Sequence, residues 1–257
     1  MKQPVIIFSN QKGGVGKTTT SRELSLYVAS LGKQVCIIDT DPQGNLTKSL
    51  IPEEEVKTGL FEALKEEPYE LTRVNEYVFL LCGDKRLSGL EKSLVGEMDA
   101  FTRLQDILGN GRFNEFEYIF IDSPPSLGIL TGNGLAAATH FVIPMSPALY
   151  TLQGTNDLME TVSKVRRTLN PNLKLLGVII NAYDAKPVIT RQITGEIREG
   201  FGDIVFSTCL SKTIKIEEAI AQKTGVTELK KLDRSRAREE VEAIGRELLE
   251  RLEAADG

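Results

Sequence analysis

The chain has 257 residues, of which 41% are hydrophobic and 26% are charged, a balance typical of globular rather than disordered proteins. Its net charge of −5 argues against attraction of nucleic acid by the whole molecule and leaves only a local basic surface for such a partner. The three cysteines lie far apart and the apolar runs are short, which excludes a disulfide framework, a C-x-x-C metal site and a membrane span.

Short apolar runs recur along the chain and predict β-strands. Several are continuous rather than alternating, as is typical of parallel strands that are covered on both faces. The predicted strands are residues 5–8, 35–38, 78–82, 118–121, 141–145, 175–180 and 204–209. The N-terminal residues run directly into the first of these strands, so we expect no signal peptide.

Stretches with helical periodicity alternate with these strands. The first, residues 18–31, places Leu24, Val28 and Leu31 on one stripe and stops at Gly32, a favoured residue just beyond a helix end. Further helices are expected at residues 157–169, 189–200 and 235–252. The alternation predicts an α/β fold with a doubly wound, mostly parallel sheet and helices on both faces. We expect one domain over residues 1–257, in which the charged, turn-rich stretch 51–76 is the nearest approach to an insertion.

A glycine-rich loop follows the first predicted strand. Residues 11–19 read Gln-Lys-Gly-Gly-Val-Gly-Lys-Thr-Thr, which departs from the phosphate-binding pattern G-x-x-x-x-G-K-[ST] only at Gln11. Its glycines let successive backbone N–H groups converge on one anion, and the helix that begins near Lys17 points its positive dipole end at the same place. Lys17 suits the β- and γ-phosphates of a nucleotide, and the Thr18 hydroxyl suits Mg²⁺. A plain glycine-rich turn would explain neither residue.

A second lysine, Lys12, lies at the mouth of this loop. The ammonium groups of Lys12 and Lys17 would repel each other unless a polyphosphate lies between them. Together they would stabilise negative charge on the bridging and γ oxygens in the transition state. If one ammonium comes from a second subunit, ATP joins two copies in a two-fold dimer.

Acidic residues follow two of the predicted strands. Asp39 and Asp41 come after residues 35–38, and Asp122 comes after residues 118–121. Because parallel strands end at one edge of the sheet, these carboxylates should meet the glycine-rich loop, one near the metal and one near the γ-phosphate. Helix N-capping is the alternative role for each aspartate. Prolines stiffen both adjoining segments, which are candidate switch elements.

Together these motifs resemble those of ParA-type partition ATPases, which belong to the deviant Walker A (ParA/MinD) class of P-loop proteins. The resemblance extends, in order, over essentially the whole chain. It rests on the segments Lys12-Gly13-Gly14-Val15-Gly16-Lys17-Thr18, Asp39-Thr40-Asp41-Pro42-Gln43-Gly44-Asn45 and Asp122-Ser123-Pro124-Pro125.

The resemblance implies ATP and Mg²⁺ as cofactors and a role for each matching residue. Lys12 would be the signature lysine, which crosses a dimer interface to ATP bound in the partner subunit, and Lys17 the ordinary P-loop lysine. Asp41 would orient the attacking water. Thr18 would bind the metal, and Asp122 would support the metal through water.

Asn181, which follows the predicted strand 175–180, matches the family position that contacts adenine. A polar residue that simply ends a strand is the alternative. The implied nucleotide-binding residues are Lys12, Gly13, Gly14, Val15, Gly16, Lys17, Thr18, Thr19 and Asn181. The family often carries a Pro-Arg pair after its last strand, where this chain has Cys209-Leu210-Ser211-Lys212.

Three functions remain open on this fold. The first is a ParA-like positioning ATPase, and the second is a MinD-like ATPase that works at a membrane surface. The third is a metabolic or metal-cluster enzyme such as the nitrogenase iron protein, which needs cluster-binding cysteines that this chain does not offer. The C-terminal stretch 239–253 is acidic and matches an anionic membrane surface poorly, so we expect it to pack on the body through Val241, Ile244, Leu248 and Leu252.

The DNA-binding function has support in the C-terminal third. Lys212 and Lys215 follow the last predicted strand, and more basic residues lie just before and within the final helix. The matching regions of ParA proteins contact the phosphate backbone of DNA, whereas a solvated charged surface is the alternative for each residue. The implied DNA-binding residues are Lys212, Lys215, Lys230, Lys231, Arg234 and Arg236.

The resemblance therefore leads us to expect a ParA-like ATPase that forms an ATP-sandwich homodimer and binds DNA non-specifically. Its hydrolysis would be slow until a ParB-like or equivalent adaptor stimulates it, and it would segregate or position a plasmid, a chromosome or a protein assembly. We expect it in the cytoplasm and on the nucleoid, without membrane insertion. The P-loop begins near residue 10, so we expect no helix-turn-helix before it and no operator-specific repression.

Overall fold

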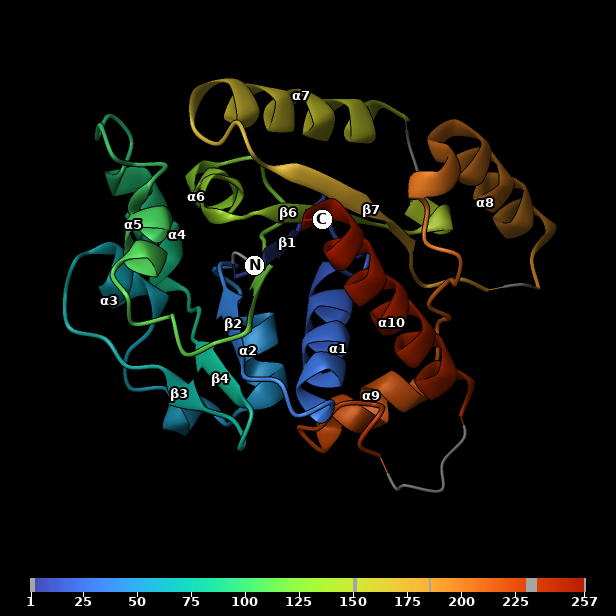
Figure 1. Cartoon of the computed structure of the whole chain (residues 1–257), viewed down its shortest axis with the longest axis horizontal. Coiled ribbons are helices and arrows are strands. Elements are labelled where there is room, and N and C mark those ends of the chain that lie inside the picture. Colours follow the sequence, from blue (N-terminus) through green and yellow to red (C-terminus); the bar gives the residue numbers. More distant parts are fainter. Residues whose placement is uncertain (1–2, 150–151, 185, 230–234, 257) are drawn as a thin grey trace.

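A twisted, mostly parallel sheet forms the centre of the molecule. The computed structural model describes residues 3–149, 152–184, 186–229 and 235–256, and within them seven strands form one sheet (Figure 1). The strands are β1 (Val5–Phe8), β2 (Val35–Asp39), β3 (Thr72–Arg73), β4 (Val78–Leu81), β5 (Tyr118–Asp122), β6 (His140–Met145) and β7 (Lys174–Ile180). Their order is β3-β4-β2-β5-β1-β6-β7, and every neighbouring pair is parallel except β3 with β4.

Helices cover both faces of this sheet (Figure 1). On one face lie α1 (Lys17–Ser30), α2 (Asn45–Leu50), α9 (Ile214–Ala221) and α10 (Arg236–Asp256). On the other lie α3 (Leu60–Leu64), α4 (Arg86–Ser93), α5 (Arg103–Gly109), α6 (Ile129–Ala137), α7 (Leu152–Thr168) and α8 (Val188–Phe201). The predicted doubly wound α/β fold is confirmed.

The continuous apolar strands are explained by this double cover. In β1, Ile6 and Phe8 join the hydrophobic core under α1, while Val5 and Ile7 join the core under α6. All four residues are therefore buried, and no polar residue alternates with them. The predicted helix stop at Gly32 is also confirmed, because this residue has φ +82° and its N–H donates to the carbonyl of Ala29.

The prediction of a strand at residues 204–209 is wrong. Residues Gly202–Ile204 form a 3₁₀ turn, and Val205 makes only an isolated bridge to Val178 of β7. The guanidinium of Arg251 donates to the carbonyls of residues 203, 204 and 205, so a side chain and not a neighbouring strand binds these carbonyls. The stretch 51–76, expected to be turn-rich, contains α3 and the antiparallel edge strand β3.

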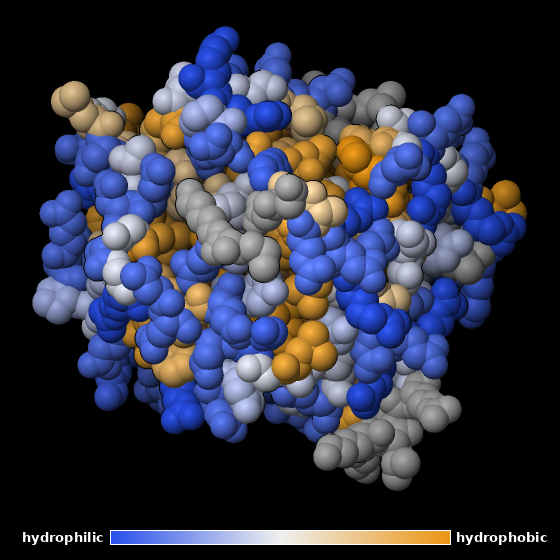
Figure 2. Space-filling model, in the orientation of Figure 1, coloured by the Kyte–Doolittle hydropathy of each residue, from blue (hydrophilic) through white to orange (hydrophobic). Residues whose placement is uncertain are grey.

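The C-terminal helix α10 packs beside α1 (Figure 1). Its apolar residues Val241, Ile244, Leu248 and Leu252 are buried, as predicted. On the face that Figure 2 shows, hydrophilic side chains dominate over this helix. Among the described helices, none is long and apolar enough to cross a membrane.

Candidate active site

Three loops meet at the carboxyl edge of the sheet. The P-loop joins β1 to α1, a second loop joins β2 to α2, and a third joins β5 to α6. Because β2, β5 and β1 are neighbours, Asp39 is paired in register with Asp122, and Asp122 with Phe8 at the start of the P-loop. The predicted convergence of the two acidic strand ends on the P-loop is thus confirmed.

The P-loop has a buried back and an exposed rim. Gly13 and Gly14 are exposed on the rim and Lys12 beside them is half-buried, whereas Lys17 is only 6% exposed. The Lys17 ammonium donates to the carbonyl of Lys12 at 3.0 Å. Burial lowers the pKa of Lys17, although the carboxylates of Asp122 and Asp41 act against this effect. Phosphate groups on the rim would offset the same cost of burying a charge.

Asn181 supports the P-loop on its buried side. It follows β7, is buried, and its amide Nδ2 donates to the carbonyl of Val15 at 3.1 Å and to the hydroxyl of Thr20 at 2.6 Å. Gly16 next to it has φ +88°, and a Cβ there would lie 2.9 Å from the Asn181 amide. The structure thus gives Asn181 a supporting contact on the P-loop, while its contact with adenine stays a prediction.

Thr18 and Asp122 form the oxygen cluster that suits Mg²⁺. The Thr18 hydroxyl donates to Asp122 Oδ2 at 2.7 Å, and the buried Oδ1 has no hydrogen-bond partner in the described part of the chain. Burial raises the pKa of Asp122 well above its usual value, and the nearby Asp39 raises it further. A cation with its bound water would satisfy this oxygen and relieve the buried charge, so these residues fit Mg²⁺.

The described residues contain no cluster of three or more His, Cys, Asp or Glu side chains that could hold a metal. At the Thr18 hydroxyl, phosphate oxygens and water would complete the coordination of such an ion. This is the usual pattern for Mg²⁺ in nucleotide sites.

Asp39 and Asp41 have different surroundings. Asp39 is fully buried and accepts hydrogen bonds from Asp41 N at 3.1 Å and from Thr47 N and Oγ1 at 2.9 and 2.8 Å. Burial raises the pKa of Asp39 to about 6. Asp39 thus fastens the first turn of α2 to β2, but the N-cap residue of this helix is Gly44, so Asp39 is not itself the N-cap residue. Asp41 is 7% exposed, accepts from Gln43 N at 2.9 Å and lies within electrostatic range of Lys17.

Two buried polar sites were not predicted from the sequence. Asn10 accepts a hydrogen bond from Lys12 N at 3.1 Å and donates to the carbonyl of Pro144 at 2.8 Å, which ties the P-loop to β6. Arg22 and Glu23 form a buried ion pair inside α1. Asn10 could have been recognised, because it follows a predicted strand just as Asn181 does. The charged pair Arg22–Glu23 could not, because charged residues within a helix are usually exposed to solvent.

The predicted DNA-binding residues that the structure describes are more exposed than the buried residues of the P-loop site. Lys212 is exposed, Lys215 pairs with Glu218 at 2.9 Å, and Arg236 pairs with Glu240 at 2.7 Å. Lys230, Lys231 and Arg234 lie outside the described residues. The structure places the described three after β7 and at the start of α10, away from the sheet's hydrogen-bonded interior, and their contact with DNA stays a prediction.

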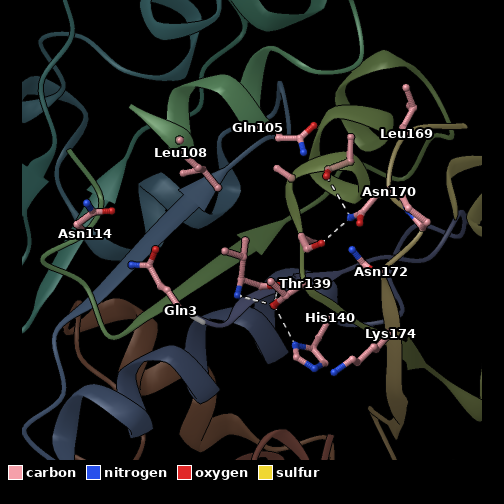
Figure 3. A pocket seen from close by; sticks show the side chains of 16 residues that line it. Gln3, Gln105, Leu108, Asn114, Thr139, His140, Leu169, Asn170, Asn172 and Lys174 are labelled. Atoms are coloured by element: carbon pink, nitrogen blue, oxygen red, sulfur yellow. Dashed lines mark hydrogen bonds between the residues drawn. The ribbon is translucent and has the colours of Figure 1, made fainter. Parts of the chain in front are cut away.

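A cavity of about 720 Å³ lies at the opposite edge of the sheet from the P-loop. Its lining includes Gln3, Thr139, His140, Asn170 and Lys174, near the amino ends of β1, β6 and β7 (Figure 3). Thr139 and Asn170 are already occupied in hydrogen bonds that fix backbone segments. This cavity is therefore not the nucleotide site.

Comparison with known proteins identifies relatives that are named as partition ATPases or partition proteins. The family model described as an AAA domain matches residues 3–175. The chromosome-partitioning ATPase Soj of Thermus thermophilus is 39% identical over 215 residues, which cover 83% of each chain. The chromosome partitioning protein ParA of Myxococcus xanthus is 36% identical over 254 residues, covering 96% of this chain and 88% of that protein.

A similar solved structure is that of cobyrinic acid a,c-diamide synthase from Mycobacterium smegmatis with bound ADP and magnesium. It has a TM-score of 0.84 and 27% sequence identity, and the match covers 98% of this chain and 96% of that one. ATP and Mg²⁺ are accordingly the cofactors of the P-loop site described above. With its P-loop, its paired acidic strand ends and relatives of this identity over most of its length, the chain belongs to the ParA/Soj family of partition ATPases.

Proposed function

We propose that the protein is a positioning ATPase that dimerises around ATP, binds DNA without sequence preference and hydrolyses ATP to segregate or position a cargo. Hydrolysis is slow until an adaptor acts, and the protein works as one domain in the cytoplasm and on the nucleoid. The observation that carries this proposal is the rim of the P-loop. There Lys12 accompanies two exposed glycines, while Lys17 already occupies the buried side of the same loop.

The residues divide the work of phosphoryl transfer to water. Gly13 to Thr19 present backbone N–H groups to the phosphates, and Lys17 neutralises the β- and γ-oxygens. Mg²⁺, held at Thr18 and supported by Asp122 through water, supplies charge neutralisation on the phosphates when bound. Asp41 accepts a hydrogen bond from the attacking water and orients it toward the γ-phosphate.

Lys12 completes the site in trans. Its ammonium reaches the phosphates in the partner subunit, where a second positive charge stabilises the transition state. ATP then joins the two copies, and each copy's basic residues act together on one DNA. Two weakly binding surfaces in one particle gain affinity through effective concentration, which makes DNA binding depend on ATP.

The membrane-surface alternative lacks such support. An amphipathic anchor needs an apolar face that can enter the lipid interface. In α10 the apolar residues are buried against the body of the protein, and the helix is rich in glutamate. The partition relatives, at 36–39% identity, also favour the positioning function over a metabolic one.

The test is Lys12→Ala. We expect the variant to stay monomeric with a non-hydrolysable ATP analogue in analytical ultracentrifugation, and its ATPase rate to fall by about 100-fold or more, the usual effect of losing one transition-state donor. The matched control is Lys164→Ala on α7, whose side chain is 69% exposed and which should behave as the wild type. A Lys12→Ala protein that dimerises normally with ATP would remove the basis of the proposal.

A further inference from the structure

Two charged residues are buried in the middle of α1. The side chains of Arg22 and Glu23 are 0% and 1% exposed and form an ion pair. In the ion pair Arg251–Glu247 the side chains are 21% and 18% exposed. Because charges lose their hydration on burial, such a pair persists only when further hydrogen bonds satisfy both groups.

Those further hydrogen bonds join three separate parts of the chain. Arg22 Nε donates to the Ser49 hydroxyl of α2 at 3.1 Å, and Arg22 Nη2 donates to the carbonyl of Thr224 at 2.7 Å. Thr224 belongs to the turn after α9. Glu23 Oε2 accepts from the backbone N–H of Val226 in the same turn at 2.8 Å. The pair thus fixes α2 and the turn after α9 to the helix that begins at the P-loop.

On one side this connection reaches the hydrolytic loop. The first turn of α2 is bound to Asp39 through Thr47, and Asp39 also accepts from the backbone N–H of Asp41. The loop that carries Asp41 is thus connected through Asp39 and Thr47 to α2, the helix that carries Ser49.

On the other side the connection reaches α9, whose first turn carries Lys215. A second contact supports it, because the Lys223 ammonium donates to the carbonyls of Lys48 at 2.6 Å and Ile51 at 3.1 Å. The turn after α9 is thus attached to α2 from both its buried and its exposed side.

We propose that Arg22 and Glu23 are positioning residues that make the loop of Asp41 and helix α9 move together, so that the bound nucleotide sets the position of Lys215 on α9. The guanidinium is planar and its donors point in fixed directions, so it cannot follow Ser49 and Thr224 if they move apart. Separation would leave a buried charge with unmade hydrogen bonds, which is costly. The DNA consequence rests on the proposed function, but the mechanical connection does not.

The test is hydrogen exchange of residues 214–229 with ADP and with a non-hydrolysable ATP analogue. In the wild type we expect exchange rates in this segment to differ by about threefold or more between the two nucleotides. In the variant Arg22→Met/Glu23→Leu, which removes both charges together, the difference should fall below about 1.5-fold, with nucleotide protection of the P-loop retained. The matched control is Arg251→Met, which also removes an arginine bound to backbone carbonyls and should keep the wild-type difference.

Two results would overturn the connection: no nucleotide-dependent difference in the wild type, or a full difference in the double variant. If the double variant does not fold, Arg22→Lys is measured by the same criterion. It keeps a charge beside Glu23 but cannot donate to Ser49 and Thr224 together.

Binding of unrelated DNA duplexes separates this proposal from the proposed function. If the wild type binds DNA with ATP, the ratio of its affinities with ATP and with ADP should fall at least fivefold, by about 1 kcal/mol, in the double variant. An unchanged ratio overturns the connection alone. A wild type that binds no DNA but shows the coupled exchange supports the connection and refutes the DNA-binding part of the proposed function.

Discussion

The carboxyl edge of the sheet and the segments after β7 differ in how their charged residues are held. At the carboxyl edge, Asp39 and Asp122 are fully buried, and each has a partner from another part of the chain. After β7, Lys215 pairs with Glu218 and Arg236 pairs with Glu240, in each case one turn away on the same helix and with at least one partly exposed side chain. A buried charge restricts which residues are tolerated at its position, because it needs specific partners. Surface ion pairs of this kind contribute little to stability, so other residues can replace them.

The largest expected effect lies at the carboxyl edge. Asp41→Ala removes the carboxylate that we propose orients water and leaves the P-loop residues proposed to bind phosphate, so turnover should fall by about 100-fold or more with ATP affinity nearly unchanged. Single-turnover hydrolysis and equilibrium nucleotide binding measure the two quantities. The ATP-bound dimer should accumulate. If the variant turns over ATP at the wild-type rate, Asp41 only caps the turn at Gln43. The carboxyl edge and the segments after β7 would then differ less in their importance for function.

A second prediction uses the buried charge of Asp122. Asp122→Asn keeps an acceptor for Thr18 and removes a carboxylate whose pKa is raised by burial and by Asp39. Above its raised pKa this carboxylate is charged in the folded protein and costs stability. Without nucleotide the variant should therefore be more stable than the wild type at pH 8, by about 1–2 kcal/mol, while losing Mg²⁺-dependent hydrolysis.

The sign of the pH dependence sharpens this prediction. As the pH falls toward 4, Asp122 is protonated in the folded protein before it is protonated in the unfolded chain, so the wild type gains stability relative to the variant. The advantage of Asp122→Asn should shrink between pH 8 and pH 5, as measured by urea unfolding. Asp106→Asn, at an exposed position of α5, is the control and should show no such trend. A variant that is less stable than the wild type at pH 8 would contradict the argument.

The smallest effect is expected after β7. Lys215→Glu should weaken ATP-dependent DNA binding by about threefold to tenfold and reduce the slope of log affinity against log salt by about 1, as for the loss of one phosphate contact. Lys164→Glu on α7 makes the same charge change at a distant exposed site and should have less than a twofold effect. Equal effects from both variants would mean that only net charge matters and that no DNA-binding surface lies on α9.

The same contrast explains what could be predicted from the sequence. The P-loop, the acidic strand ends and six of the strands could be predicted, because buried apolar runs and glycine-rich turns are compatible with few other local structures. The role of Asp39 as an anchor for α2 depends on Thr47, which becomes its neighbour only when α2 folds back. The run at 204–209 has the composition of a strand, but carbonyls at its start bind Arg251 from the far end of the chain, which the sequence does not reveal. Short helices such as α2 and α9 lack the length over which helical periodicity can be recognised.

The two outermost strands of the sheet, β3 and β7, have a consequence for assembly. In the described part of the chain, β3 has only two residues, and the outer side of β7 is covered by the segment around Val205 and Phe206. Neither border offers a long row of unpaired peptide groups onto which another molecule could extend the sheet. Strand addition between copies of this protein is therefore disfavoured at both borders, which leaves loops and helices as the surfaces through which the proposed dimer would form.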